Sequence, residues 1–346
     1  MRPLTPSRVL GRCGILAAVL FVCVVSALKV GAVPVSLYAL ARDLIRVALH
    51  QASQLSTDYQ LIIFDIRLPR IVLGIFVGAS LSVAGASFQA LLRNPLADPY
   101  ILGISGGAGL GAIIAQIAVS HLAMPAALAA LLTPLGAFAG ALVTIVLVYM
   151  FGNRQGQIET STLLLGGVIT ASFLSAMTMF LFTTVAGRDL HGTAFWLMGD
   201  LSTPMQKSVA WIVRVGFFVA AGIIYTTATD LNLLSAGEKE AMHLGVDVKR
   251  VRLVVYVAAS ILTGLAVSVS GMIGYIGLLV PHAMRSLFGS DYRMLLPTAA
   301  FGGAIAVVVA DALARTVVAP AEVPVGAISA MVGAPVFMYL LRRRPA

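Results

Sequence analysis

The chain has 346 residues, of which 59% are hydrophobic and only 11% are charged. Soluble domains carry about 25% charged residues, and a mean hydropathy of +0.98 excludes a soluble protein. The bases behind the net charge of +9 are scattered along the chain, which excludes the basic stripe of a nucleic-acid-binding protein. We therefore expect an all-α polytopic membrane protein, a single domain over 1–346 with its membrane-spanning region at 14–341.

Apolar runs of about 20 residues, the length that crosses a bilayer core, recur along the chain. The first run follows Arg2, Arg8 and Arg12 and is long enough to be a retained helix rather than a cleaved signal peptide. The eighth is short and contains Pro281. About ten spans are expected, near residues 14–33, 70–92, 100–120, 125–151, 161–186, 207–229, 253–273, 274–289, 294–317 and 325–341.

Lysine and arginine mark the cytoplasmic ends of membrane helices. Arginines precede the first span, and Arg342, Arg343 and Arg344 follow the last. Both termini are therefore expected in the cytoplasm, which requires an even number of spans and supports ten.

In this topology three arginines fall on the outer side. Arg67 and Arg70 flank Pro69, which suits a helix start before the second span, and Arg315 ends the ninth. Two interpretations stay open: these arginines bind lipid phosphates, or they bind carboxylates of an external protein through bidentate pairs. Asp311 precedes Arg315 by one helical turn, which favours a mutually neutralising pair.

The second span ends in a segment with two prolines, Arg93-Asn94-Pro95-Leu96-Ala97-Asp98-Pro99. Prolines interrupt helices, and irregular backbone at membrane depth survives only inside protein or beside water. A plain inner turn and a break that lines a cavity are equally compatible with this segment. Gln89, just before it, either bonds to a neighbouring helix or faces a pore.

Small residues recur at a spacing of four, which favours close helix packing over a flexible gate. A weak repeat at an offset of 186 spans five helices, so that its two copies would be inverted relative to each other. The glycines at spacing four are Gly74 and Gly78, Gly103 and Gly107, Gly107 and Gly111, and Gly136 and Gly140. The repeat pairs are Gly78 with Gly264, Gly85 with Gly271, Pro95 with Pro281, and Gly103 with Gly289.

The longest inner polar segment, residues 230–252, predicts a short helix outside the bilayer at about 237–244. Ser235 and Glu238 have the spacing of a capping box, and Gly245 can end the helix. The helix is either a solvated connection or a docking helix for a cytoplasmic partner, and the sequence favours neither.

The chain contains no Gly-Lys pair and hence no P-loop, so we expect no enzyme and place any ATP hydrolysis in another chain. The histidines lack metal-ligand spacing, and no cofactor is expected. The scarcity of acidic residues in the middle of the spans counts against an ion-coupled carrier.

Four long stretches resemble the FecCD family of permeases, which import iron chelates, heme and cobalamin. They are RLPRIVLGIFVGASLSVAGASFQALLRNPLADPYILGISGGAGLGA (67–112), LNLLSAGEKEAMHLGVDVKR (231–250), GMIGYIGLLVPHAMRSLFGSDYRMLLP (271–297) and ADALARTVVAPAEVPVGAISAMVGAPVF (310–337). The resemblance covers nearly the whole chain after the first 60 or so residues.

The resemblance implies a type II ABC importer permease in the bacterial inner membrane, as a homodimer or pseudo-dimer. It implies two cytoplasmic ATPase subunits and a periplasmic or lipid-anchored binding protein, which docks on Arg67, Arg70 and Arg315. The expected cargo is an iron–siderophore, with heme and cobalamin close behind. The alternative is a secondary carrier with inverted repeats that works without an ATPase.

The resemblance also implies two further sets of functional residues. The coupling contact with the ATPase corresponds to Gly237, Glu238, Glu240, Ala241, Leu244 and Gly245 within the cytoplasmic coupling loop, 230–252. The pathway and gate correspond to Asn94, Pro95, Leu96, Thr160 and Ser161, to which we add Gln89 from its position in the second span.

Overall fold

The computed structural model describes residues 5–342 except 32, 34, 49–55, 123, 155–156, 159, 184–189 and 204. Within the described residues, eight helices are long and apolar enough to cross a membrane. Two shorter apolar helices, α13 (Ile276–Phe288) and α15 (Val325–Arg342), lie where the eighth and tenth spans were expected. The predicted all-α membrane fold is therefore confirmed.

The long helices correspond one by one to the other expected spans. They are α1 (Pro6–Lys29), α4 (Leu68–Leu91), α5 (Ile104–His121), α6 (Ala126–Gly152), α7 (Thr160–Phe182), α9 (Lys207–Thr226), α12 (Val248–Ser270) and α14 (Tyr292–Ala314). The elements between them are α2 (Leu37–Ala48), α3 (Thr57–Gln60), a π-helix (Leu61–Arg67), a 3-10 helix (Pro99–Leu102), the hairpin β1 (Asn153–Arg154) with β2 (Gln157–Ile158), α8 (Leu190–Leu197), α10 (Ala228–Ala236) and α11 (Glu238–His243).

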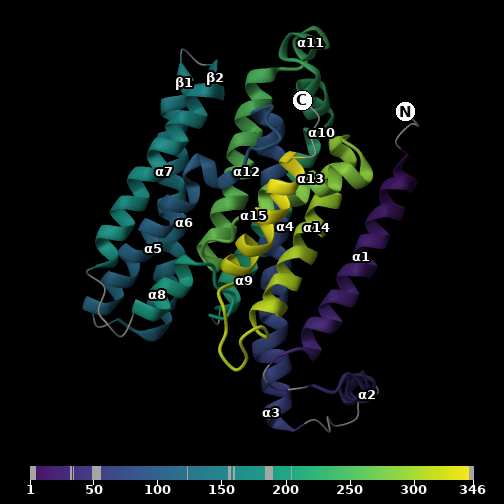
Figure 1. The fold of residues 1–346 in the computed structure, drawn as a ribbon, viewed down its shortest axis with the longest axis vertical. Coiled ribbons are helices and arrows are strands. Elements are labelled where there is room, and N and C mark those ends of the chain that lie inside the picture. The colour runs from purple at the N-terminus through teal and green to yellow at the C-terminus, as the bar shows by residue number, and fades with distance from the viewer. Residues whose placement is uncertain are drawn as a thin grey trace.

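The helices run between two ends of one bundle (Figure 1). The start of α1, the hairpin β1–β2, α11 and the C-terminal end of α15 lie at one end, which we call the α11 end. The elements α2 and α3 lie at the opposite end, which we call the α2 end. The chain thus alternates between ends as the ten expected spans require.

The helix α4 lies in the centre of the bundle and α1 at its edge. The span that contains α4 has 83% of its apolar window buried inside the protein, whereas α1 has 6%. The neighbours of α4 are α12, α13 and α14. Because α4 is apolar on all sides and carries small residues, it can be surrounded by other helices.

Glycine contacts hold these helices close together. A Cβ atom at Gly78 of α4 would meet the backbone of Gly303 in α14, and one at Gly111 of α5 would meet the backbone of Gly136 in α6. Within a membrane the hydrophobic effect does not drive helices together, so such close backbone contacts supply the packing energy. The interpretation of these glycines as packing residues is confirmed.

Replacing Gly78 by alanine is expected to lower the free energy of unfolding by about 1–3 kcal/mol, because the added Cβ would lie 2.6 Å from the Gly303 carbonyl carbon. The matched control is Gly222→Ala in α9, where no atom lies within 4 Å of the added Cβ. The control is expected to be neutral or slightly stabilising because alanine favours the helix. Equal melting temperatures for the two purified variants would contradict the packing role.

Pro69 lies in the first turn of α4, as expected, but helical structure begins earlier than the predicted second span. A continuous helical segment runs from Thr57 to Leu91 and includes the π-helix just before α4. The N–H of Leu68 donates to the carbonyl of Ile63, which is the wider turn of a π-helix. That irregular turn accommodates a residue without an N–H, which explains how the proline lies inside the segment.

The repeat at an offset of 186 does not pair residues of the same structural role. Gly78 and Gly264 both lie inside long helices, α4 and α12. Pro95, however, lies in a turn after α4, whereas Pro281 lies inside α13. The inverted repeat therefore stays a prediction without support from these positions.

Candidate functional site

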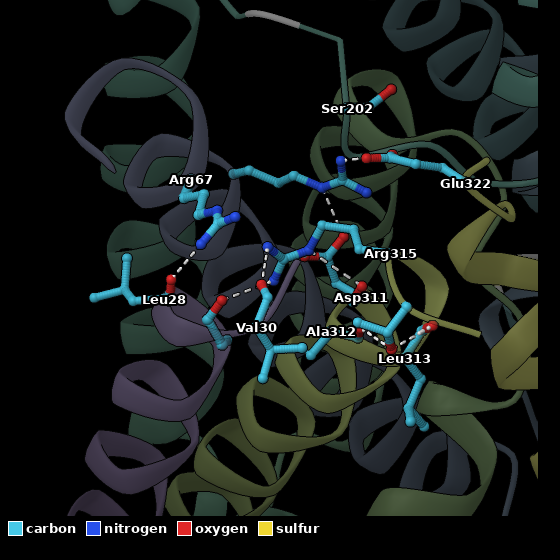
Figure 2. A network of polar contacts seen from close by, with 12 residues as sticks. Leu28, Val30, Arg67, Ser202, Asp311, Ala312, Leu313, Arg315 and Glu322 are labelled. Atoms are coloured by element: carbon cyan, nitrogen blue, oxygen red, sulfur yellow. Dashed lines mark hydrogen bonds and ion pairs between the residues drawn. The ribbon is translucent and has the colours of Figure 1, made fainter. Parts of the chain in front are cut away.

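The three arginines assigned to the outer side come together. Arg67 and Arg315 lie near each other beside Val30 (Figure 2), and Arg70 shares Asp311 with Arg315. Arg70 donates from Nε to Oδ1 of Asp311 at 2.7 Å and from Nη1 to Oε2 of Glu322 at 2.8 Å. Arg315 forms an ion pair with Oδ2 of Asp311 at 3.1 Å. The predicted pair of Asp311 and Arg315 is thus confirmed, and Arg70 is a second cation on the same carboxylate.

Two of these arginines cap the C-terminal end of α1. Arg67 donates to the carbonyl of Leu28 at 2.7 Å, and Arg315 donates to the carbonyls of Ala27 and Val30, each at 3.2 Å. The last carbonyls of a helix have no partner within it, and its C-terminal end carries a partial negative charge. Two guanidinium groups satisfy both needs and fix α1, an otherwise lipid-facing helix, to α4 and α14.

The arginines themselves are buried. The exposed fractions are 6% for Arg67, 8% for Arg70 and 6% for Arg315, whereas the Glu322 side chain is 40% exposed. A carboxylate of an external protein or a lipid phosphate would therefore have to replace an internal acceptor. Docking through these residues stays a prediction, and Glu322 is the member of the cluster that an external partner reaches first.

The predicted helix in the inner loop is confirmed as α11. It begins after Gly237, and Leu244 and Gly245 end it, the latter with a left-handed φ of +86°. The N–H of Val246 donates back to the carbonyl of Ala241 at 3.0 Å, which closes the last turn. Glycine suits this end because left-handed backbone costs it little.

The predicted capping box of Ser235 and Glu238 is wrong. Ser235 lies inside α10, and its hydroxyl donates to the carbonyl of Leu231 at 2.8 Å. At the start of α11 the carboxylate of Glu240 reaches back to Gly237, where a side chain would collide with it. An acidic group at this end suits the positive end of the helix.

The helix α11 is anchored on one side and exposed on the other. Glu238 forms an ion pair with Arg252 of α12, and Ala241 is completely buried. Met242 and Leu244, in contrast, are 54% and 67% exposed. The helix therefore presents apolar side chains to solvent from a fixed position, outside the membrane spans.

The segment after α4 turns back into the protein. Asn94 accepts at Oδ1 from the N–H of Leu96 at 2.9 Å, and its own N–H donates to the carbonyl of Gln89 at 3.1 Å. Beyond this turn, residues 97–99 are buried. The hydroxyl of Tyr100 then accepts from the N–H of Ile273, in the break between α12 and α13, at 2.7 Å. The two irregular segments are therefore coupled.

The predicted pathway residues fall into two groups at the α11 end. Gln89 is 3% exposed and bonds across to α13, where it accepts from Arg285 at 3.2 Å, so its helix-bridging interpretation is confirmed. The second group, Thr160 and Ser161, starts α7, and the side chain of Thr160 lies outside the described residues. A role in a pathway stays a prediction for both groups.

Comparison with known proteins places the chain among permeases. The FecCD transport family matches residues 19–343. A cobalamin import system permease protein of Halobacterium salinarum is 43% identical over 82% of this chain and 74% of its own. A hemin transport system permease protein of Yersinia pestis is 40% identical over 81% of this chain and 83% of its own.

A solved structure has the same fold along nearly the entire chain. An inward-facing metal-chelate type ABC transporter aligns with a TM-score of 0.81 and 29% identity, over 98% of this chain and 100% of that one. The family match, the relatives and the ten apolar helices agree with one another. The chain belongs to the FecCD transport family.

Proposed function

We propose that the chain is the transmembrane permease subunit of an ATP-driven importer for a metal chelate. The observation that carries this proposal is α11, a short helix outside the spans that is anchored to α12 and exposes Met242 and Leu244. Because the sequence contains no P-loop, ATP-driven transport through this chain requires a partner that hydrolyses the ATP. An anchored helix with an apolar surface can transmit the motion of such a partner. Family membership supports the same assignment.

The proposed assembly contains two permeases, two ATPase subunits and an external binding protein in a bacterial inner membrane. The α11 end faces the cytoplasm, because most lysines and arginines lie there, including Arg8 and Arg12 before the first span. The α2 end faces outward and receives the binding protein. Alternation between outward and inward access would follow movement of α11, which reaches the membrane helices through α12.

Within the proposed class of cargo, the sequence resemblance favours an iron–siderophore. The names of the two relatives described above add hemin and cobalamin. Uptake by cells that express the complete system, measured with labelled ferric siderophore, hemin and cobalamin, separates the three. Uptake of none of them would contradict a metal-chelate cargo.

Docking of the binding protein is expected to depend on the balance between Arg70 and Glu322. Glu322→Gln removes the exposed internal partner of Arg70, so the cognate binding protein is expected to bind more tightly. Arg70→Gln is expected to weaken binding by about tenfold or more, since a charged hot spot is lost. Binding of the purified partners by surface plasmon resonance tests this, and unchanged affinity in both variants would exclude Arg70 from the docking site.

The partnership with an ATPase has a direct test. The permease is expected to co-purify with the ATPase subunits when the two are co-expressed, at one ATPase per permease. Elution of the permease free of ATPase under all detergent conditions would contradict the proposal.

A further inference from the structure

A large basic pocket lies at the α11 end, apart from α11 itself. Its walls come from the first turns of α1, the end of α4, α10, the end of α13 and the start of α14. Its volume is about 1330 Å³, above the roughly 300–1,000 Å³ of common small-molecule pockets. Two predicted pathway residues, Gln89 and Pro95, lie in its wall, but no function proposed above uses its basic side chains.

The pocket has a strong excess of positive charge. Its charged lining residues are Arg8, Arg12, Arg93, Arg285, Arg293 and Asp291. Asp291 accepts from Arg293 at 2.6 Å and from Asn232 at 2.8 Å. Mainly through the bond from Arg293, the pKa of Asp291 falls to about 2. The one acidic residue of the lining is therefore already paired with Arg293, and the lining keeps an excess of positive charge that favours an anion.

Two of the arginines are held in place by the pocket walls. Arg12 donates from Nη1 to the backbone carbonyl of Phe288 at 2.7 Å, and its guanidinium lies 5.6 Å from the centre of the Phe288 ring. Arg285 is fixed by its bond to Gln89. Each guanidinium carries five N–H donors, so these contacts leave most donors to face a ligand. Such fixed donors suit an oxyanion better than mobile surface lysines do.

Arg93 adds a third guanidinium from an uncommon backbone conformation. Its φ is +47°, in the left-handed region that residues with a Cβ rarely adopt, and its side chain is exposed. Among the described residues its side chain has no hydrogen bond or ion pair. Strained backbone that aims a charged group is typical of binding sites.

The position of the pocket indicates which anion it binds. Its outer wall is α1, whose Leu10 and Ile15 are 72% and 64% exposed, so the pocket borders the lipid-facing side of the bundle. It lies where α1 and α14 begin and α13 ends, at one end of the apolar helices. We propose that this pocket binds the phosphate headgroup of an anionic phospholipid, with the acyl chains along α1. Basic pockets between membrane helices bind such headgroups. An apolar wall can contact the acyl chains of a lipid, which a free phosphate does not have.

The test uses the full chain in nanodiscs of phosphatidylcholine with phosphatidylglycerol, and native mass spectrometry counts the lipid retained. The variant Arg93→Gln leaves every described side-chain contact intact, and a second variant combines Arg12→Gln with Arg285→Gln. Each variant is expected to retain at least about tenfold less phosphatidylglycerol than the wild type does. The control, Lys249→Gln with Arg250→Gln, removes two bases at the same end outside the pocket and is expected to retain lipid as the wild type does. Melting temperature with either lipid gives the second measurement.

Three results would overturn the proposal. Equal lipid retention in both pocket variants and the control would show that the pocket binds no lipid. Stabilisation of the wild type by inorganic phosphate as large as by phosphatidylglycerol would assign the pocket to a free anion. Loss of ATPase binding in Arg93→Gln, with lipid retention unchanged, would assign it to the ATPase interface. The proposal does not depend on transport activity, so it can fail while the proposed function holds.

Discussion

Replacing Asp311 by alanine is expected to lower the free energy of unfolding by about 3–5 kcal/mol, because the change leaves buried cations without their shared carboxylate. Arg70 and Arg315 both pair with Asp311, and all three residues are less than 9% exposed. Arg315 also holds the end of α1. Thermal unfolding of the purified variant in detergent, together with its level in the membrane, measures the loss.

The matched control is Glu322→Gln, which removes the other carboxylate from the same Arg70. Because the Glu322 side chain is 40% exposed, water screens this pair, and a loss of about 0–1 kcal/mol is expected. Losses of equal size in the two variants would show that burial of the cluster does not determine its contribution.

Replacing Leu244 by aspartate is expected to abolish ATPase binding, and with it transport, while the permease stays folded. Leu244 is 67% exposed, so its loss costs the isolated chain little, whereas a partner would bury it. Buried apolar anchors at the centre of interfaces contribute about 2 kcal/mol or more, and a desolvated charge adds a penalty. Co-purification of ATPase subunits with the variant is expected to fall by at least tenfold, a factor equal to about 1.4 kcal/mol.

The conservative variant Leu244→Met separates surface chemistry from helix stability, because methionine is also apolar and helix-forming. It is expected to retain ATPase binding. If Leu244→Asp binds the ATPase as the wild type does, α11 is a solvated connection and not a coupling helix.

The spans could be predicted because hydropathy and length are enough to place membrane helices. The split of α12 from α13 was the least certain part of the predicted spans, because only glycines and Pro281 interrupt residues 253–289. The structure places Gly271–Tyr275 between the two helices and Pro281 inside α13. The spacing of four between Gly74 and Gly78 predicted that Gly78 lies in a close helix contact. It did not predict that the contact is with Gly303, because only the fold brings α14 beside α4.

Burial of the arginine cluster could not be predicted from the sequence. Arg67 and Arg70 were read as outward groups because they precede a span, yet the helix continues outward to Thr57 and places them inside the bundle. The pattern also gave no signal that Arg67 and Arg315 bond to carbonyls at the end of α1, since those contacts join residues far apart in the chain.

The capping box failed for a local reason. Ser235 and Glu238 have the required spacing, but the apolar residues before them continue α10 through Ser235. Its hydroxyl then bonds within that helix, and Gly237 ends the helix two residues later. A spacing motif therefore predicts a helix start only where the preceding helix has already ended.

The basic pocket could not be predicted from the sequence, in which its arginines are scattered. Arg8 and Arg12 marked only the inner side of the first span, and nothing in the sequence spacing joins them to Arg93 and Arg285. The fold gathers them because α1 begins, and α4 and α13 end, at the same end of the bundle.

The central claim is that ATP hydrolysed by partner subunits drives import through this chain. The most direct measurement is uptake of a labelled metal chelate into proteoliposomes that contain the permease, its ATPases and its binding protein, with ionophores present to collapse ion gradients. We predict that uptake requires ATP, is unaffected by the ionophores and is abolished by Leu244→Asp. Uptake by the permease alone that follows an ion gradient and ignores ATP would contradict the account and identify a secondary carrier.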